Sequence, residues 1–398
     1  MTILFLTSRI PYPPYRGDKL KIWNLLRQLS KRHKIVLVSF IQHEQERRYE
    51  TQLKEVCQEI HLVHLSRWKS LLNCVLAIFG SEPFQVAYYR SARMAAVLHE
   101  TLARVNPDVI HTHLIRMAQY TVSRTQCPRI LDLTDAVSLY LSRLSTVHHN
   151  PFVRWLVSLE LTRMVAYESI ISHFDRSLVC SEHDRRFLAS RIPTADIGLL
   201  YNGVDLEAFS VNGTIQAEPH RIIFTGNMSY VPNRDGAKFF VQEIFPHIRE
   251  KIPDATFFIV GQDPPASVRA LASQRIIVTG FVSDIRQEYL KSAVAVSPVR
   301  FGAGTLNKIL EPLALGIPVV STSVGIDGLG LKAGKEILVA DEPQAFATAV
   351  VRMLSDKKLR AEIAGSAAEK IRARYSWEKI SSDLEVEYQS VMQRKTSN

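Results

Sequence analysis

The stretch FGAGTLNKILEPLALGIPVV, residues 301–320, combines a glycine-containing loop, a short amphipathic helix and an apolar strand. The run AVAVSPV (293–299) just before it is mostly apolar and predicts another buried strand. A strand, a loop, a helix and a strand in this order form the unit of a parallel sheet covered by helices. The stretch therefore indicates an α/β fold, with the loop at the carboxyl end of a strand.

The same alternation continues in both directions. Apolar runs predict strands before the middle of the chain at 2–8, 33–40, 60–65, 108–113, 129–134, 176–181 and 197–202. Further strands are predicted at 221–226, 255–261, 275–281, 293–299, 318–323 and 336–341. The turn-rich segment 202–220 separates the two sets. We therefore expect two doubly wound, Rossmann-like α/β domains, at 1–205 and 219–375, with a linker at 206–218.

The composition is that of an ordinary globular protein, with 398 residues, 46% hydrophobic and 22% charged. The cysteines are far apart and form no CxxC pair, which argues against a zinc site or a disulfide framework; they are Cys57, Cys74, Cys127 and Cys180. The first residues contain too short an apolar run for a secretory signal, and no apolar run reaches the ~20 residues that span a bilayer. We expect a soluble, cytoplasmic protein with reduced thiols.

The net charge of +10 is concentrated in the first half of the chain. Residues 1–210 contain 26 Lys and Arg against 19 Asp and Glu. A basic domain suits an anionic partner such as a membrane surface or a phosphorylated substrate. The basic residues are dispersed and accompany no zinc-finger or RRM motif, so we expect no nucleic-acid binding. Solubility alone is the simpler alternative.

Residues 67–90, RWKSLLNCVLAIFGSEPFQVAYYR, mix aromatic and aliphatic side chains with flanking basic ones. This composition suits a contact with the surface of an anionic membrane. A helix that covers the sheet is the simpler interpretation, and we prefer it here.

The loop and helix of the first stretch have the features of an anion site. Unpaired N–H groups at a helix N-terminus attract anions, and Gly302 and Gly304 let a phosphate approach the backbone. Thr305 can cap the helix or donate its hydroxyl. Lys308 lies in the first turn, where a cation is unfavourable unless an anion binds. Glu311, three residues later on the same face, can accept hydrogen bonds from a ribose diol.

The alternative is a surface Lys–Glu pair beside an ordinary glycine turn. Two common phosphate motifs are excluded. A Walker loop is absent because the pair Gly334–Lys335 is followed by Glu336. A GxGxxG fingerprint is absent because the first strand–helix turn contains only Gly17.

Together these motifs resemble the retaining glycosyltransferases of family four, which have the two-domain GT-B fold. Matching elements in the same order are DVIHTH, CSEHD, YNGVD, FTGNM, FIVG, VTGFVSDI, the 301–320 stretch and YSWE at 375–378. They cover almost the whole chain. IPYPPYRGDK and GNMSYVPNRDG look most similar to sugar transferases of bacterial PEP-CTERM/exosortase exopolysaccharide systems.

The resemblance implies two domains facing a cleft, with the first on the acceptor side and the second binding a nucleotide-diphosphate-sugar, UDP or GDP based. It implies sugar transfer with retention, no metal and no other cofactor. The acceptor would be a glycan or a polyprenyl-linked glycan at the inner face of the plasma membrane. A C-terminal helix at 376–398 would cross back to the first domain.

Donor-binding residues follow from the same resemblance. Glu311 matches the second glutamate of a Glu-x7-Glu motif, but Ala303 stands where the first is expected. Asn227 replaces an expected arginine. The full set of candidate donor contacts is Gly17, Gly226, Arg234, Lys238, Gly280, Phe281, Val282, Arg300, Gly302, Gly304, Thr305, Lys308 and Glu311.

The candidate catalytic residues are His111 and His113, which share one face of their strand because two residues separate them. We prefer His113, nearer the carboxyl end where ligands bind in parallel sheets; a hydrogen-bonded structural histidine is the alternative. Asp132 and Asp135 could bind an acceptor hydroxyl or cap the next helix, and we prefer capping.

Two other functions stay open. A nucleotide-sugar 2-epimerase shares the double α/β architecture but needs no acceptor. The alanine at 303 also allows an inactive protein that only binds nucleotide-sugars.

Overall fold

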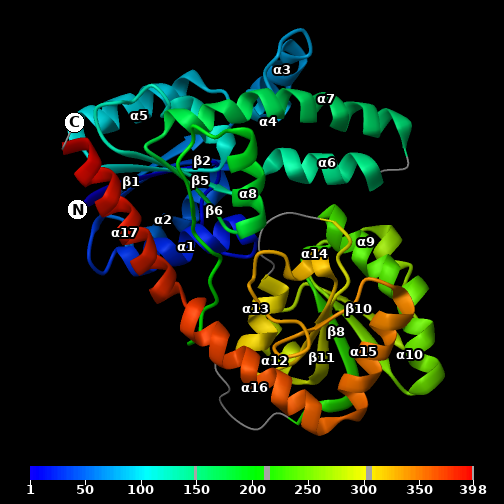
Figure 1. Cartoon of the computed structure of the whole chain (residues 1–398). Coiled ribbons are helices and arrows are strands. Elements are labelled where there is room, and N and C mark those ends of the chain that lie inside the picture. The colour runs from blue at the N-terminus through cyan, green and yellow to red at the C-terminus, as the bar shows by residue number, and fades with distance from the viewer. Residues whose placement is uncertain (148–149, 210–215, 302–306, 397–398) are drawn as a thin grey trace. The chain divides into compact units, whose positions relative to one another are not determined.

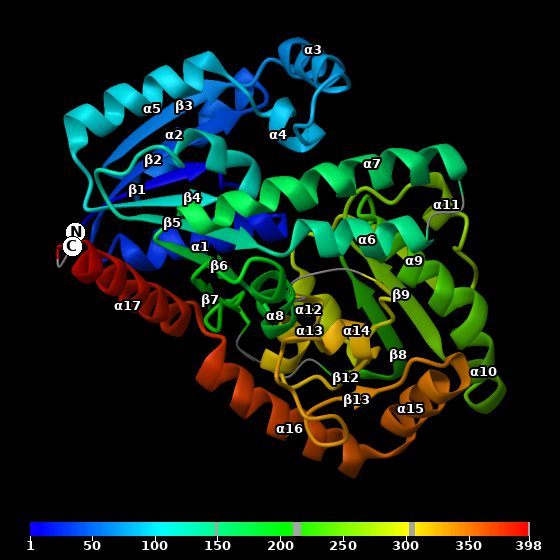
Figure 2. The same ribbon diagram turned by 45° about the horizontal axis from the view of Figure 1, so that its top comes forward.

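The computed structural model describes residues 1–147, 150–209, 216–301 and 307–396. Contacts divide the chain into two compact units, Met1–Tyr201 with Ile380–Asn398, and Asn202–Lys379. Each unit contains one parallel sheet with helices on both of its faces (Figures 1 and 2). The prediction of two Rossmann-like α/β domains is therefore confirmed.

The first unit contains a seven-stranded sheet in the order β3-β2-β1-β4-β5-β6-β7. Its strands are β1 Thr2–Thr7, β2 Lys34–Ile41, β3 Glu59–His64, β4 Val109–His113, β5 Arg129–Thr134, β6 Arg176–Val179 and β7 Ile197–Leu199. Its main helices are α1 Gly17–Leu29, α2 Glu50–Lys54, α3 Arg67–Ala77, α4 Phe84–Tyr88, α5 Ala92–Val105, α6 Val137–Val147, α7 Pro151–Tyr167 and α8 Glu182–Arg191. The central strands are buried almost throughout, which is why they appear as continuous apolar runs.

The second unit contains a six-stranded sheet in the order β10-β9-β8-β11-β12-β13. Its strands are β8 Glu218–Thr225, β9 Thr256–Val260, β10 Ile276–Gly280, β11 Ser292–Ser297, β12 Val319–Ser321 and β13 Leu338–Val339. Its helices are α9 Val231–Phe239, α10 Phe245–Lys251, α11 Ala266–Arg269, α12 Ile285–Leu290, α13 Asn307–Ala314, α14 Ser323–Ile326, α15 Pro343–Ser355 and α16 Lys357–Arg374. Phe240 anchors the core, with its ring centroid 4.2 Å from that of Phe257.

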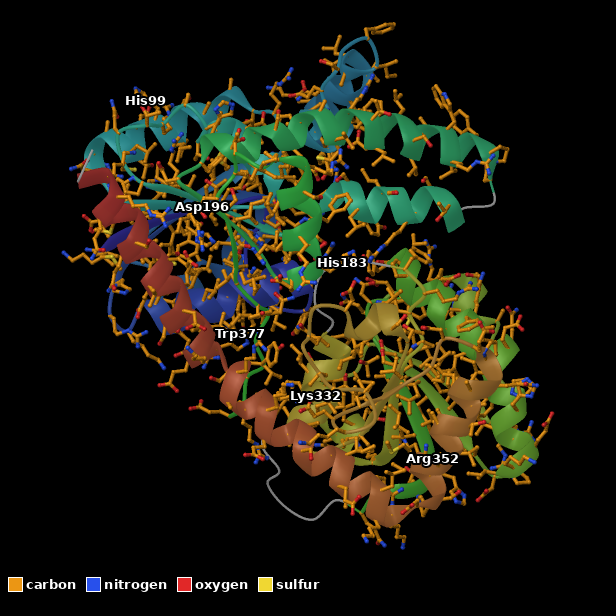
Figure 3. The ribbon with its side chains drawn as sticks, in the orientation of Figure 1. His99, His183, Asp196, Lys332, Arg352 and Trp377 are labelled. Atoms are coloured by element: carbon orange, nitrogen blue, oxygen red, sulfur yellow. The ribbon has the colours of Figure 1, made fainter. Side chains whose placement is uncertain are left out.

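The last helix, α17 Trp377–Thr396, begins in the second unit and ends in the first. Its later turns are held in the first unit by Glu387, which pairs with Arg176 at 2.8 Å, and by Tyr388, whose hydroxyl lies 2.8 Å from His111 Nδ1. Its first residue, Trp377 (Figure 3), packs in the second unit against Gly203. A Cβ at Gly203 would lie 2.6 Å from this ring, so glycine is required here.

The segment before β8 differs from our expectation. Residues 202–205 belong to the second unit and not to the first domain, because Val204 N donates to Tyr375 O at 2.7 Å. The first unit therefore ends at Tyr201.

In each sheet the strand order reverses beside the first strand. The reversal lies between β1 and β4 in the first unit and between β8 and β11 in the second. The connections leave these neighbouring strands in opposite directions, which opens a crevice at their carboxyl ends where α/β proteins bind ligands. Each of the two reversals is therefore a candidate ligand site.

Candidate functional site

In the second unit, Lys308 and Glu311 lie on α13, which follows β11 at the point of reversal. Lys308 is buried; its Nζ donates to Asn233 Oδ1 and lies 5.0 Å from the centroid of the Phe224 ring. Burial lowers the pKa of Lys308 to about 7, although Glu311 opposes the shift. A lysine held in this way changes charge near neutral pH.

Glu311 lies three residues after Lys308 on α13. Its Oε2 accepts a hydrogen bond from the Tyr289 hydroxyl at 3.2 Å, and the same hydroxyl lies 2.5 Å from Thr225 Oγ1. Burial raises the pKa of Glu311 to about 7, against the effects of Tyr289 and Lys308. Perturbed groups of opposite sign at a strand reversal mark a candidate binding site. The simpler alternative, an exposed Lys–Glu surface pair, is wrong because Lys308 is buried.

Asn233 on α9 is a member of this site that the sequence analysis missed. Its Oδ1 accepts from Lys308, and its Nδ2 donates to Asn227 O at 2.8 Å. A Cβ at Gly226, where φ is +154°, would lie 2.6 Å from Asn233 Nδ2. Gly226 therefore makes room for the asparagine. The sequence signal was the Pro–Asn pair in the first turn of α9, but it did not show that Asn233 contacts Lys308.

The other cations of the donor set differ in their availability. Arg300 forms a two-armed ion pair with Asp235, at 2.6 and 2.9 Å, and stacks over Phe239. Arg234 and Lys238 lie one turn apart on α9 and are partly exposed. Within the described ranges, neither makes a side-chain hydrogen bond or ion pair. Arg234 and Lys238 are thus freer than Arg300 to meet an anion.

The rest of the donor set lies in three segments. Gly280, with φ +73°, ends β10 and is followed by exposed Phe281 and partly buried Val282. Gly302, Gly304 and Thr305, together with Ala303, lie outside the described residues.

Gly17 lies in the other unit, as the first residue of α1. It does not have a positive φ and a Cβ there would meet nothing within 4 Å, so its backbone conformation does not require glycine.

In the first unit, His113 ends β4 and lies on a small pocket. The pocket is lined by Ser8, Arg9, Pro11, Asp18, Lys19, Ile22 and His113, and lies at the reversal between β1 and β4. His113 Nε2 is 3.3 Å from Thr134 Oγ1, and burial lowers the pKa of His113 to about 4. At neutral pH the imidazole is therefore uncharged and can accept or donate a hydrogen bond.

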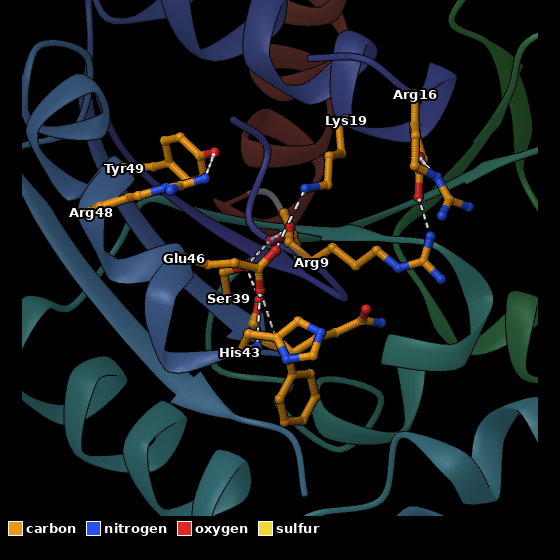
Figure 4. A network of polar contacts seen from close by, with 12 residues as sticks. Arg9, Arg16, Lys19, Ser39, His43, Glu46, Arg48 and Tyr49 are labelled. Atoms are coloured by element: carbon orange, nitrogen blue, oxygen red, sulfur yellow. Dashed lines mark hydrogen bonds and ion pairs between the residues drawn. The ribbon is translucent and has the colours of Figure 1, made fainter. Parts of the chain in front are cut away.

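The pocket wall is charged and interconnected (Figure 4). Asp18 pairs with Arg9 at 3.1 Å and with Arg16 at 3.6 Å. Lys19 pairs with Glu46 at 3.8 Å. Burial alone would raise the pKa of Asp18, but the two arginines hold it below its usual value. Carboxylate and guanidinium groups of this kind suit the hydroxyls of a sugar.

The backbone beside the pocket is strained. Leu114, directly after His113, has φ +72°, and Thr134 at the end of β5 has φ +67°. A β-branched residue rarely adopts this conformation, and such strain gathers at functional sites. The pocket, and not the strand interior, is therefore the candidate site of this unit.

His111 has different surroundings, although it lies on the same face as His113. It is fully buried; Nδ1 is 2.8 Å from the Tyr388 hydroxyl, and Nε2 is 3.6 Å from Asp132 Oδ2. We therefore keep His113 and assign His111 a structural place.

The expectation that Asp132 caps the next helix is wrong. It is buried and pairs with Lys21 at 2.8 Å, so it does not cap a helix. At the start of α6, Ala136 N and Ser138 N instead donate to Asp184 and Glu168, at 3.3 and 3.0 Å. Burial beside Asp184 raises the pKa of Asp135 to about 7.

A metal centre has no obvious ligand set. In the part of the chain that the structure describes, no three His, Cys, Asp or Glu side chains come together as a metal would require. The four cysteines lie in the described residues and form no disulfide.

Most of the second unit matches a known family model. Residues 219–356 match the family model "Glycosyl transferases group 1". This part of the chain is therefore similar to group 1 glycosyltransferases. All the candidate residues described in the second unit lie within the matched range.

Similarity to known proteins extends beyond residues 219–356. The chain is 23% identical to an uncharacterized 44.6 kDa protein in the cps region of Klebsiella pneumoniae, over 96% of this chain and 98% of the relative. Sucrose-phosphate synthase from Thermosynechococcus elongatus has a similar structure, with a TM-score of 0.71, 16% identity and coverage of 99% and 100%. HepE from Anabaena, in complex with UDP-glucose, has a TM-score of 0.67, 14% identity and 100% coverage of both chains.

Proposed function

We propose that the protein is a retaining glycosyltransferase that moves a sugar from a nucleotide-diphosphate-sugar to a glycan or polyprenyl-linked glycan during exopolysaccharide synthesis. The observation that carries the proposal is the buried Lys308–Asn233 contact with Glu311 beside it, at the strand reversal of a group 1 glycosyltransferase domain. The UDP-glucose complex of the similar HepE fold supports a donor of this class. The resemblance to PEP-CTERM-associated transferases and the similar cps-region protein support the polysaccharide setting.

In the proposed reaction, the bond between the anomeric carbon and the diphosphate oxygen breaks, and a bond to the acceptor oxygen forms on the same face. The acceptor hydroxyl gives its proton to the leaving phosphate. Negative charge grows on that phosphate, so a protonated Lys308, with Arg234 and Lys238 as further candidates, would stabilise the transition state. Glu311 would hold the ribose, the 280–282 backbone would frame the base, and His113 would contact the transferred sugar. We propose no metal.

A thermal-shift panel tests the donor site. UDP, GDP, ADP and their sugars are added to the wild type, to Glu311→Ala and to Glu362→Ala, a control with an exposed glutamate on α16. A ligand at ~100 times its dissociation constant stabilises the folded state by ~2.7 kcal/mol. We expect one nucleotide to raise the melting temperature of the wild type and the control, but not of Glu311→Ala. No shift with any nucleotide would contradict the proposal.

Donor affinity should be highest near pH 7 and fall on both sides. Above pH 7 the unliganded protein loses the Lys308 proton that the diphosphate needs, because the pKa is lowered to about 7. Below pH 7, Glu311 becomes protonated and accepts ribose hydrogen bonds less well, because its pKa is raised to about 7. Each limb should approach a tenfold loss per pH unit.

Calorimetric titration with UDP-glucose between pH 5.5 and 8.5 measures this profile, because its diphosphate is a diester and lacks the terminal phosphate ionisation, with a pKa of about 6, that UDP would add. Lys308→Met should remove the alkaline limb alone, and Glu311→Gln the acidic limb alone. A flat profile in the wild type would show that neither group faces the nucleotide.

Product analysis separates this function from its rivals. A new glycoside indicates a transferase, an isomerised donor indicates the 2-epimerase, and nucleotide binding without turnover indicates the inactive protein. We also propose a cytoplasmic location at the inner face of the plasma membrane.

A further inference from the structure

Helix α3 of the first unit has its apolar face turned outward. Trp68, Leu71, Leu72, Val75 and Leu76 follow the three- and four-residue spacing of one helix face, and all are more than half exposed. Trp68 is 83% exposed and Phe79, just after the helix, 89%. Figures 1 and 2 show α3 projecting beyond the other helices of this unit. The simpler expectation, a helix covering the sheet, is therefore wrong for α3, whereas Val86 and Tyr89 later in the segment 67–90 do pack in the core.

The inner face of α3 is small and polar. Ser70 and Ala77 are the buried residues of the helix. Asn73 Nδ2 donates to Arg90 O at 3.1 Å, and Cys74 Sγ to Phe84 O at 3.5 Å. These bonds fix α3 by its polar side.

The loop after α3 is fixed as well, by helix α7. Arg163 donates to Ile78 O at 3.0 Å, and Glu160 accepts from Phe84 N at 2.7 Å. The outward position of the apolar face is thus held by specific contacts. Soluble proteins rarely leave such a large apolar surface exposed unless it binds something.

The charges around α3 indicate what it binds. Residues 60–81 contain no Asp or Glu, whereas Arg67 and Lys69 are exposed on the helix itself. Arg90 and Arg93 are exposed nearby in sequence, although Glu82 pairs with Arg90. Anionic lipid headgroups complement these positive charges, and Trp68 beside them suits a membrane interface. A second copy of the chain would bring the same positive charges together, which opposes self-association.

We propose that α3 and residues 78–79 insert into the headgroup layer of an anionic membrane, with the helix lying in the plane of the surface. This deepens the proposed function and rests on it for the acceptor. β3 leads into α3 at the carboxyl edge of the sheet, the edge on which the His113 pocket also lies. Three strand spacings separate β3 from β4, about 14 Å. A bilayer at α3 would therefore meet the sheet edge that carries the pocket, where a lipid-linked acceptor is needed.

Vesicle co-sedimentation of the full chain tests the membrane contact. The vesicles are phosphatidylcholine with and without phosphatidylglycerol. The wild type should bind the anionic vesicles, and Trp68→Ser/Leu72→Ser/Phe79→Ser should reduce the partition coefficient at least tenfold. The matched control is Phe152→Ser/Trp155→Ser, which removes two aromatic rings at the start of α7 that are also more than half exposed and should bind as the wild type does. Because all these side chains are exposed, the variants should fold.

Fluorescence locates the contact. Lipids brominated near the headgroup should quench the wild type and Trp155→Phe, and should quench Trp68→Phe much less. The proposal would be overturned if the triple variant bound anionic vesicles as well as the wild type does, or if the wild type did not bind them. A wild-type dimer that the triple variant abolishes, without vesicle binding, would assign the surface to a second copy instead.

Nucleotide thermal shifts in the same proteins keep the two proposals apart. The triple variant should keep the nucleotide shift of the wild type. Vesicle binding without any nucleotide shift would refute the donor site but support the membrane contact. A nucleotide shift without vesicle binding would support the donor site and refute the membrane contact.

Discussion

Lys308→Met is expected to lower kcat/KM for sugar transfer by about 100- to 1000-fold, the usual effect of removing one preorganised group that stabilises transition-state charge. Lys308 is buried and its Nζ contacts Asn233, so its position is set before the donor arrives. Affinity for the nucleoside diphosphate should fall, whereas affinity for the nucleoside without phosphates should not. Steady-state kinetics and calorimetric titration measure both.

The control for this variant is Lys358→Met, which removes a lysine whose side chain is 88% exposed on α16 of the same unit. It should keep wild-type kinetics. Lys308→Met leaves Asn233 Oδ1 without this donor, at a cost of about 1–3 kcal/mol, so its melting temperature must be measured as well. A folded Lys308→Met variant with kcat/KM within threefold of the wild type would refute a role for this lysine at the phosphates.

Lys21→Met should destabilise the protein by about 3–5 kcal/mol, because it leaves the fully buried Asp132 without its cation. Although burial opposes it, Lys21 lowers the pKa of Asp132 well below its usual value. A carboxyl with a depressed pKa stabilises the fold at neutral pH and loses that contribution as the pH falls through the folded-state pKa. Without Lys21 the pKa should rise, so the deficit of the variant should shrink in acid.

Calorimetry between pH 5 and 7.5 measures this prediction, with each thermal transition followed separately because the chain has two units. The double variant Lys21→Met/Asp132→Leu should recover much of the loss, since it removes the buried charge. Lys31→Met, which removes an exposed lysine just after α1, is the control and should melt with the wild type. Equal stability of Lys21→Met and the wild type at pH 7 would contradict the prediction that Lys21 compensates the buried charge of Asp132.

The first of these predictions concerns a contact that the sequence could not reveal. Lys308 and Asn233 are 75 residues apart, and a helix-and-loop motif indicates an anion site without saying which side chains lie beneath it. The same limit applies to Lys21 and Asp132, 111 residues apart, where helix capping was the local expectation. Both pairs join elements that are brought together by the order of the strands in the sheet. Local sequence patterns do not contain that order.

The sequence by itself determined the strands and the fold class. Every predicted strand is present, because a strand buried on both faces needs a continuous apolar run wherever it occurs. It also determined that His111 and His113 share a face, since alternation along a strand is a local property.

Only the tertiary structure decided which histidine reaches a pocket and which way α3 faces. Tyr388 on α17 covers His111, and that helix comes from the far end of the chain. In α3 the helical spacing of its apolar residues shows that an apolar stripe exists, but a stripe that packs on a sheet and one that meets a membrane have the same period. What covers a face depends on long-range packing, which puts the small residues Ser70 and Ala77 inward and Trp68 outward.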